Sequence, residues 1–262
     1  NSRLTGSNDW IFFHNNPSFN SEKFFEENKI DKNKPIIGLA TNVLWDAQID
    51  YPSNFFSGMM EWLFYTIDHF IQNPNLQLLI RIHPAEVNET KPSRQRVAEE
   101  ILKKYKKLPP NIIVVKPENN ISTYSIFEKC KSVIIYGTKL GIELSAMKKL
   151  VIVCGESFIR NKNVGLDINN IVEYKEILNK IEDIDYEYFD LDNDKALKYA
   201  YHFFFRRTVN LKSIVERKGK WPNYAINKDY SKILLNKSDS GLENICDSII
   251  HGSDYVYPDE RF

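Results

Sequence analysis

Three things are scarce in this sequence: an excess of charge of one sign, cysteine, and long apolar runs. Lys and Arg together number 35, as do Asp and Glu, so the net charge is zero. General nucleic-acid binders usually carry a basic excess, so this balance argues against that class. No apolar run approaches the ~20 residues of a membrane-spanning helix, and no signal peptide is visible. We therefore expect no nucleic-acid partner and no membrane span.

The three cysteines, Cys130, Cys154 and Cys246, lie far apart in the chain. Their spacing fits neither a disulfide framework nor a metal site. Cys130 and Cys154 end apolar runs, so we expect both to be buried thiols in a reducing, cytoplasmic protein. The sequence starts with Asn1 rather than with methionine, and for this reason we expect a fragment of a longer protein.

Hydrophobic residues make up 42% of the chain, which is typical of a globular protein with a buried core. Short apolar runs alternate with segments of helical periodicity. This alternation predicts an α/β fold, a Rossmann-like parallel sheet of about five strands with helices on both faces. The expected strands are 36–41, 76–82, 111–115, 133–136 and 150–154, and the expected intervening helices are 57–72, 93–107, 122–130 and 141–148.

The chain is expected to divide into three parts. Residues 1–33 are polar and form a lead-in or linker with a short helix at 21–28. Residues 34–182 form the Rossmann-like domain, and residues 183–262 form a helical extension that packs on it. Further helices are expected at 174–180, 195–209 and 241–251. The aromatic stretch 198–207 within the extension is most simply a packing segment, although its two arginines could instead face a phosphate.

The turn after the fourth strand carries the strongest functional signal. Gly137, Thr138 and Lys139 stand where a helix begins, with Gly141 and Glu143 close behind. A helix N-terminus offers unpaired N–H groups and partial positive charge, and small residues let an anion approach the backbone. We expect this turn to bind a nucleotide phosphate. Thr138 could also act only as a helix cap.

Glu143 would repel a phosphate, so its expected partner is the pair of ribose hydroxyls of a nucleotide. The alternative is an ordinary carboxylate facing solvent. Lys116, which follows the third strand, is a further candidate for binding phosphate.

Ligands of open parallel sheets bind beyond the carboxyl ends of the strands, so the other loops at that edge matter too. His83 ends the second strand, and Pro84 stiffens the turn that aims its imidazole, which makes His83 the candidate catalytic residue. It could instead merely end the strand.

Candidate sugar-binding residues follow three of the strands. They are Asn42 and Asp46 after the first strand, Glu86 after the second and Glu118 after the third. Trp45 could stack on a sugar or pack over the sheet edge. Glu86 and Glu118 are more simply interpreted as solvated loop carboxylates.

Several motifs occur together in the chain: His83-Pro84 at a strand end, Tyr136-Gly137-Thr138 with Gly141 and Glu143, Gly155 with Phe158, and the stretches 41–47 and 199–206. Over roughly residues 34–210 this combination resembles the bacterial capsule and surface polysaccharide glycosyltransferases, which have the GT-B architecture of two Rossmann-like domains. The His-Pro dipeptide is also similar to that of bacterial sialyltransferases and teichoic-acid polymerases, in which it contacts the nucleotide phosphate.

The resemblance implies the C-terminal, nucleotide-sugar-binding half of such an enzyme, with His83, Thr138 and Glu143 in matching positions. Many relatives have Ser or Thr where this chain has Lys139 and Leu140, which leaves the phosphate contacts open. The implied partners are a nucleotide sugar and a glycan or lipid-linked acceptor, reached at the inner membrane through partner proteins. Neither a metal nor a cofactor is implied.

Two other functions remain open from the sequence. One is a nucleotide-sugar 2-epimerase of similar fold, which would need a fuller set of charged groups around the sugar. The other is a module without catalysis that binds nucleotide or polysaccharide, or that scaffolds a synthase complex.

Overall fold

The computed structural model describes residues 16–45, 51, 54–88, 92–209, 211, 214–217, 224–226 and 239–257. The chain forms two compact units, Asn1–Ala196 and Leu197–Phe262. The division therefore falls after residue 196, some way beyond the expected end of the Rossmann-like domain at 182. Packing of the extension on that domain stays a prediction.

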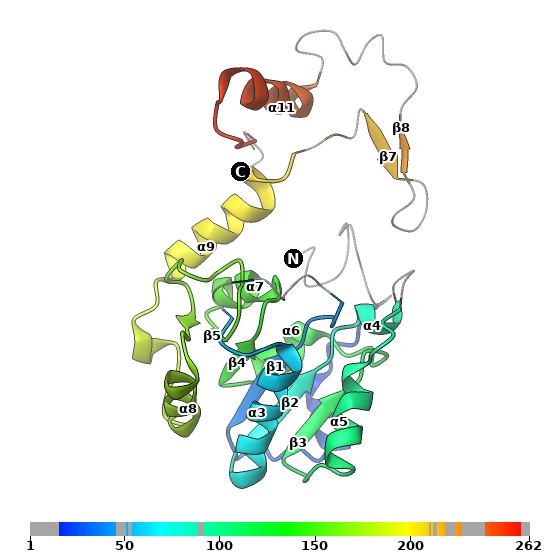
Figure 1. The fold of residues 1–262 in the computed structure, drawn as a ribbon, viewed down its shortest axis with the longest axis vertical. Coiled ribbons are helices and arrows are strands. Elements are labelled where there is room, and N and C mark those ends of the chain that lie inside the picture. The colour runs from blue at the N-terminus through cyan, green and yellow to red at the C-terminus, as the bar shows by residue number, and fades with distance from the viewer. Residues whose placement is uncertain are drawn as a thin grey trace. The chain divides into compact units, whose positions relative to one another are not determined.

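A parallel sheet of six strands forms the centre of the first unit, in the order β3-β2-β1-β4-β5-β6 (Figure 1). Every strand but the last is a short apolar run whose residues are nearly all buried, as expected for a sheet covered on both faces. The strands are β1 (Ile36–Ala40), β2 (Gln77–Arg81), β3 (Ile112–Val115), β4 (Ser132–Ile135), β5 (Leu150–Val153) and β6 (Leu166–Asp167).

The predicted Rossmann-like α/β fold is confirmed, with all five expected strands in place. β6 is an addition, because two residues paired with the end of β5 leave no periodic signal in a sequence. One further short helix, α4 (Ala85–Asn88), lies in a segment that was expected to be a loop.

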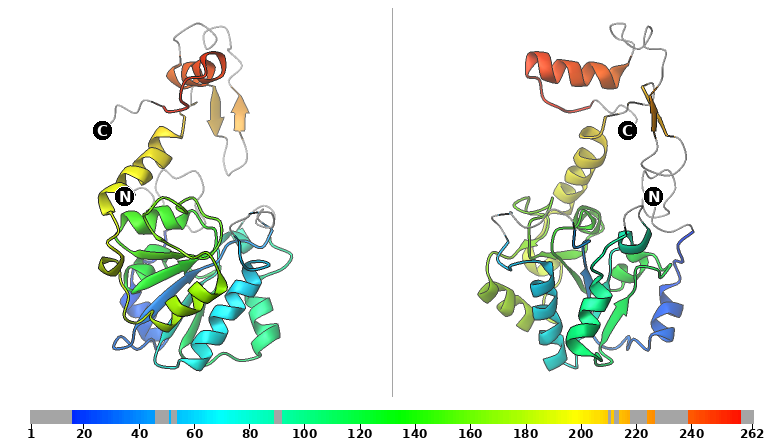
Figure 2. Two further views of the ribbon diagram at one scale, coloured as in Figure 1. Left: turned by 60° about the vertical axis from the view of Figure 1, so that its left-hand side comes forward. Right: turned by 45° about the vertical axis from the view of Figure 1, so that its right-hand side comes forward.

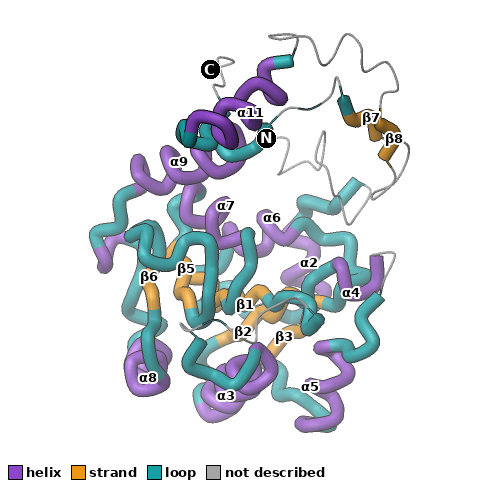
Figure 3. Tube along the Cα trace, turned by 45° about the horizontal axis from the view of Figure 1, so that its top comes forward, coloured by secondary structure: helices purple, strands orange, loops and turns teal. Residues whose placement is uncertain are grey.

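Helices cover both faces of the sheet (Figure 3). One face carries α3, α5 and α8, and the other carries α2, α6 and α7 (Figure 2). The bounds are α2 (Ser21–Glu27), α3 (Met59–Gln72), α5 (Val97–Tyr105), α6 (Thr123–Glu128), α7 (Leu140–Ala146) and α8 (Ile171–Asn179). A 3₁₀ turn, η1 (Glu187–Phe189), follows α8.

The main core lies between the sheet and α3, α5 and α8. Trp62 of α3 is fully buried and its ring lies 5.4 Å from that of Tyr136. Tyr174 of α8 is equally buried, and its hydroxyl is 2.6 Å from the hydroxyl of Thr66 in α3. This contact satisfies two polar groups within an apolar layer, where an unpaired hydroxyl would be costly.

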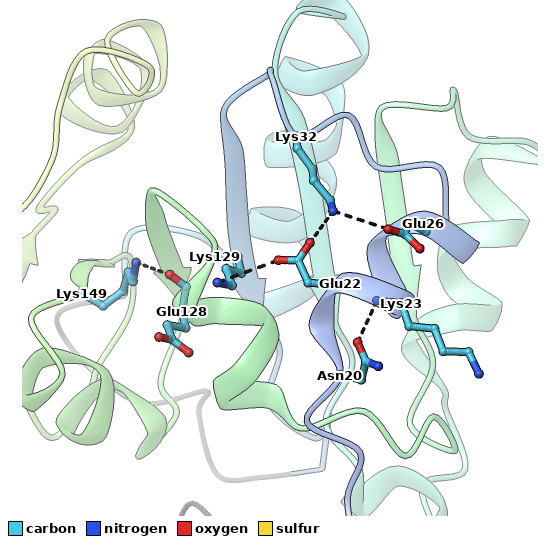
Figure 4. Close-up of polar contacts among 8 residues, drawn as sticks. All are labelled: Asn20, Glu22, Lys23, Glu26, Lys32, Glu128, Lys129 and Lys149. Carbon is cyan, nitrogen blue, oxygen red and sulfur yellow. Dashed lines mark hydrogen bonds and ion pairs between the residues drawn. The ribbon is translucent and has the colours of Figure 1, made fainter.

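The described part of the lead-in packs on the domain rather than linking to it. Phe24 and Phe25 of α2 are buried, and the side chain of Gln77 in β2 accepts from the backbone N–H of Asp31 at 2.8 Å. The surface of α2 also carries exposed ion pairs, Lys32 with Glu22 and with Glu26 (Figure 4). Exposed pairs of this kind add little stability, so the buried aromatic rings hold α2 in place.

The predicted helical C-terminal portion is confirmed, and the second unit also contains a short pair of strands. α9 (Asn193–Tyr201) runs across the division between the units and continues as a π-helix over His202–Arg206. Two short antiparallel strands follow, β7 (Val215–Arg217) and β8 (Tyr224–Ile226), and then α11 (Ser240–His251). Tyr257 donates its backbone N–H to the carbonyl of Arg206 at 2.7 Å.

The backbone carbonyl of Tyr257 also accepts from Arg206 Nε at 2.8 Å. Arg206 thus has a packing role within the second unit.

Cys130 and Cys154 are buried free thiols, as predicted. Burial raises the pKa of Cys130 to about 12, so the thiol stays protonated and inert. No helix among the described residues has the length and hydropathy needed to cross a lipid bilayer.

Gly38 of β1 is a packing constraint that can be tested. A Cβ at this position would lie 2.9 Å from the ring of Phe127 in α6 and 3.1 Å from Val133 in β4. Because tight cores resist added methyl groups, we expect Gly38→Ala to lower the free energy of unfolding by about 1–3 kcal/mol. Urea unfolding followed by circular dichroism measures this change.

Gly58→Ala is the matched control, since nothing lies within 4 Å of a Cβ built at Gly58. Equal losses of stability in the two variants would contradict the proposed contact between α6 and β1.

Candidate functional site

The strand order reverses between β1 and β4, and the loops after these two strands diverge there. In open α/β sheets the ligand crevice lies at such a point, beyond the carboxyl ends of the strands. The two loops are joined, because Asn42 Oδ1 after β1 accepts from the backbone N–H of Gly137 after β4 at 3.3 Å. Asn42 is buried, so it serves as a strut between the loops. Its expected contact with a sugar stays a prediction.

His83 is anchored to the same edge through β1. Its backbone N–H donates to Thr41 Oγ1 at 3.1 Å. Its ring Nδ1 accepts from the backbone N–H of Ala85, also at 3.1 Å. An imidazole that accepts through Nδ1 carries its proton on Nε2 when neutral. His83 therefore presents Nε2–H as its donor.

The environment of His83 keeps that donor neutral. Burial lowers the pKa of His83 to about 4, with the positive charges of Arg81 and Lys139 adding to the effect. The imidazole is thus a fixed hydrogen-bond donor at neutral pH, rather than a proton shuttle.

The turn after β4 differs in detail from the expectation. Gly137 N–H is taken by Asn42, and Thr138 Oγ1 accepts from the N–H of Leu140 at 3.3 Å, which is a local cap. Lys139 is exposed. Packing explains the glycine at position 141, because a Cβ there would lie 2.7 Å from Ile135 in β4 and 3.1 Å from Ile159. Phosphate binding by these four residues stays a prediction, with Lys139 as the side chain that reaches solvent.

Glu143 lies in the first turn of α7 and contacts a residue that the sequence did not single out. Tyr124 of α6 donates its hydroxyl to Glu143 Oε2 at 2.9 Å. Both side chains are partly buried. The hydrogen bond from Tyr124 therefore restricts the orientation of the Glu143 side chain.

Arg81, at the end of β2, organises the loop after β3. Its buried guanidinium donates to the carbonyls of Lys116 at 2.8 Å and Asn119 at 3.1 Å. It also donates through Nε to Thr123 Oγ1 at 3.2 Å, at the start of α6. Burial lowers the pKa of Arg81 to about 10, which leaves it charged at neutral pH. Lys116 and Glu118 themselves are exposed, and their ligand contacts stay predictions.

Glu86 is not a solvated loop carboxylate, and this expectation was wrong. Its side chain is fully buried in α4, and Oε1 accepts from the N–H of Val97 at the start of α5 at 3.2 Å. Among the described residues, Oε2 has no hydrogen-bond partner. Burial raises the pKa of Glu86 to about 7, although Arg96 opposes the shift. The carboxylate ties α4 to the start of α5, and its expected contact with a sugar stays a prediction.

The loop after β5 is fixed by two residues that the sequence did not reveal. Asn54 Oδ1 accepts from the N–H of Glu156 at 2.9 Å. A Cβ on Gly155 would lie 2.8 Å from the carbonyl of Tyr136, so the two strand ends meet there. The buried Arg160 donates to Gly155 O at 3.0 Å and to Ile168 O at 2.7 Å. Loops after β1, β4 and β5 are thus tied together.

Two expected contributors remain to be placed. Asp46 lies outside the described residues, and its expected contact with a sugar stays a prediction. Trp45 is 58% exposed, and its expected stacking on a sugar stays a prediction beside the alternative that it packs over the sheet edge. Within the described part of the chain, no three His, Cys, Asp or Glu side chains gather as metal ligands would.

The raised pKa of Glu86 predicts a pH-dependent stability. Between the ordinary value near 4.5 and the folded value of about 7, the folded state binds more protons than the unfolded state. This contribution to stability is therefore present at low pH and lost as pH rises through that window. At about 1.4 kcal/mol per pKa unit, Glu86→Gln should gain about 2–3 kcal/mol over the wild type between pH 5 and pH 8.

Urea unfolding of both proteins at pH 5, 6.5 and 8 measures the difference. His83 acts in the opposite sense over a similar range, but it is common to both proteins and cancels. A difference in unfolding free energy that stays constant with pH would contradict the buried state of Glu86.

The chain is similar to several solved structures at low sequence identity. A β-Kdo 2,7-transferase of KpsC from Thermosulfurimonas dismutans has 20% identity and a TM-score of 0.43, covering 70% of this chain and 52% of that one. The β-Kdo 2,4-transferase of the same protein has 11% identity and a TM-score of 0.43, covering 76% and 58%.

A UDP-GlcNAc 2-epimerase from Neisseria meningitidis bound to UDP-GlcNAc has 14% identity and a TM-score of 0.48, covering 69% and 46%. The chain thus spans about half the length of the structures it matches.

A search of curated protein sequences finds no match. The sequence does match the family model described as "Capsule polysaccharide biosynthesis protein" over residues 16–172, which is more than half of the chain. The matched region contains the six strands of the parallel sheet and the loops that form the candidate site. The chain belongs to the capsule polysaccharide biosynthesis protein family.

Proposed function

We propose that the first unit binds the nucleotide-sugar donor of a glycosyltransferase that acts in bacterial surface polysaccharide synthesis. One observation carries the proposal. His83, whose Nδ1 accepts from the N–H of Ala85, follows β2, and the exposed Lys139 follows β4, so both stand beyond the carboxyl ends of strands in one parallel sheet. A fixed donor beside an exposed cation suits a phosphate oxygen.

The chemistry of glycosyl transfer gives these groups their task. The bond between the anomeric carbon and the phosphate oxygen breaks, and negative charge develops on the departing nucleotide. Donors that are already oriented stabilise this charge without reorganising at the moment of reaction. His83 is held by hydrogen bonds on both its backbone and its ring, so its direction is set before a ligand arrives.

Glu143 completes the proposed site. A carboxylate placed directly on a phosphate would oppose binding, so we assign it to the ribose hydroxyls of the nucleotide. We further propose that the acceptor is a glycan or lipid-linked glycan, in keeping with the family. In the GT-B arrangement of two Rossmann-like domains, a partner domain would supply the acceptor site. A nucleotide-sugar donor places this work in the cytoplasm.

Nucleotide binding tests the proposal through His83. Calorimetry with CMP, CDP, UDP and GDP should reveal at least one that binds the full chain. His83→Asn should weaken that binding by about 10- to 100-fold, the effect of losing a hydrogen bond to a charged group. Asparagine suits the test because its Oδ1 can accept from the N–H two residues on, as His83 Nδ1 does.

His69→Asn is the matched control. His69 lies in the last turn of α3, away from the carboxyl ends of the strands, and is hydrogen-bonded to Asn73. Its replacement should leave nucleotide affinity unchanged. If none of the four nucleotides binds the wild type, the proposed function is wrong. If one binds and His83→Asn binds it equally well, the role of His83 is wrong.

Capsule production in cells separates an enzyme from a scaffold. A transferase should lose polymer when His83→Asn replaces the chromosomal copy, whereas a scaffold of the synthase complex should retain it. Immunoblotting for the protein confirms that both variants accumulate to the wild-type level.

A further inference from the structure

Thr41 carries a buried hydroxyl at the point where the chain leaves β1. β1 and β2 pair in parallel register up to Ala40 with Arg81, and the backbone N–H of Thr41 continues the ladder by donating to the carbonyl of Arg81 at 3.1 Å. In a regular parallel ladder the next bond would run from the N–H of His83 to the backbone carbonyl of Thr41. That N–H donates to the side-chain oxygen Oγ1 of Thr41, at 3.1 Å. The hydroxyl thus takes the position of the next acceptor in the ladder.

This arrangement lets the loop after β1 turn away while His83 keeps its bond to the sheet. The N–H of Asn42, the next residue, donates to Met59 Sδ at 3.1 Å, at the start of α3. The chain therefore turns from the sheet toward α3 directly after Thr41. A side chain without a hydroxyl at position 41 would leave the N–H of His83 without this acceptor, and an unpaired N–H away from water is costly.

His83 is held on its other side by α4. Its carbonyl accepts from the N–H of Glu86, and its ring Nδ1 accepts from the N–H of Ala85, both at 3.1 Å. These two contacts fix His83 relative to α4, whereas the contact with Thr41 fixes it relative to β1. Because β1 lies between β2 and β4, Thr41 relates the imidazole to the turn that carries Lys139.

We propose that Thr41 is a positioning residue for His83, and that its hydroxyl sets the direction in which the imidazole meets a ligand phosphate. This inference deepens the proposed function and rests on it. The side chain of Thr41 is only 1% exposed, so it acts through His83 and does not touch the ligand. A hydrogen-bond donor stabilises charge effectively only when it is held in the right geometry beforehand, so a small displacement weakens it.

Hydrogen exchange of the His83 backbone N–H, followed by NMR on the full chain, tests the contact without any ligand. Thr41→Val keeps the shape of the side chain and removes the hydroxyl. We therefore expect the N–H of His83 to exchange at least about 10-fold faster in this variant than in the wild type. Thr41→Ser keeps the hydroxyl and should retain the slow exchange.

Calorimetry with CMP, CDP, UDP and GDP tests the consequence for binding. For a nucleotide that binds the wild type, Thr41→Val should weaken binding by about 5- to 20-fold, as is typical of neighbours that act together. Thr41→Ser should stay within about 2-fold of the wild type. When Thr41→Val is added to His83→Asn, the affinity should fall no further, as expected if Thr41 acts through the imidazole.

Thr66→Val is the matched control, because it deletes another buried threonine hydroxyl of the same unit. Thr66 lies in the middle of α3, where its Oγ1 donates to the carbonyl of Trp62 at 2.8 Å and lies 2.6 Å from the hydroxyl of Tyr174. This change should lower the free energy of unfolding. It should leave both the exchange at His83 and the nucleotide affinity at their wild-type values.

Each outcome decides between the claims. Slow exchange at His83 in Thr41→Val overturns the contact. Unchanged affinity in Thr41→Val, or an equal loss in Thr66→Val, overturns the positioning role although nucleotide binding stands. Failure of the wild type to bind any of the four nucleotides removes the proposed function, whereas the exchange measurement still decides whether Thr41 holds His83. If Thr41→Val does not fold, fast exchange of the His83 N–H in the wild type still overturns the inference.

Discussion

The reversal of strand order at β1 is the constraint on which the rest of the site depends. The chain adds β2 and β3 on one side of β1, then crosses to the opposite side to add β4, β5 and β6. Right-handed crossovers then place α3 and α5 on one face of the sheet and α6 and α7 on the other, so the loops after β1 and β4 lead to opposite faces. The candidate site residues are therefore judged by how close they lie to the reversal of strand order between β1 and β4. A different strand order would keep the same side chains at one edge of the sheet but would change which of them are neighbours.

Most polar groups at this edge bind one another. Thr41 accepts from His83, Asn42 from Gly137 and Asn54 from Glu156, while Arg81 donates to the loop after β3. These contacts join loops from all five principal strands through buried or half-buried side chains. The loops therefore lose their conformational entropy during folding, before any ligand binds. A ligand meets a preorganised edge, and preorganisation is what makes electrostatic stabilisation effective.

The sequence predicted the fold well because the strands are short runs of apolar residues with clear breaks between them. It also predicted that the polar residues which follow the parallel strands gather at one edge of the sheet, because the carboxyl ends of parallel strands lie there. It could not reveal Arg81, Asn54 or Tyr124, whose partners lie 19 to 102 positions away. These contacts depend on packing between elements, and no local periodicity records them.

Glu86 is a residue for which the local sequence pattern predicted the wrong environment. A glutamate between a proline and a run of polar residues has the pattern of a solvated loop, and only the fold of α4 against α5 buries it. Gly141 likewise has the pattern of a phosphate-binding glycine. Its missing side chain instead makes room for Ile135 and Ile159, the close helix–sheet packing that such folds require.

The electrostatics of the site follow from where charge is buried and where it is exposed. Arg81 is buried and donates its hydrogen bonds to carbonyls and a hydroxyl. It therefore contributes positive potential and also fixes the loop after β3. Lys139 is exposed and adjustable. Between them the imidazole of His83 stays neutral, because a third positive charge would have to be buried beside two others.

Burying a neutral hydrogen-bond donor away from water costs less free energy than burying a cation, and the neutral donor can still form a directed hydrogen bond. The groups at this edge therefore have different roles. Positive charge comes from Lys139, which faces solvent, and from Arg81, which makes several hydrogen bonds. A hydrogen bond of fixed direction comes from His83, whose backbone and ring are both held.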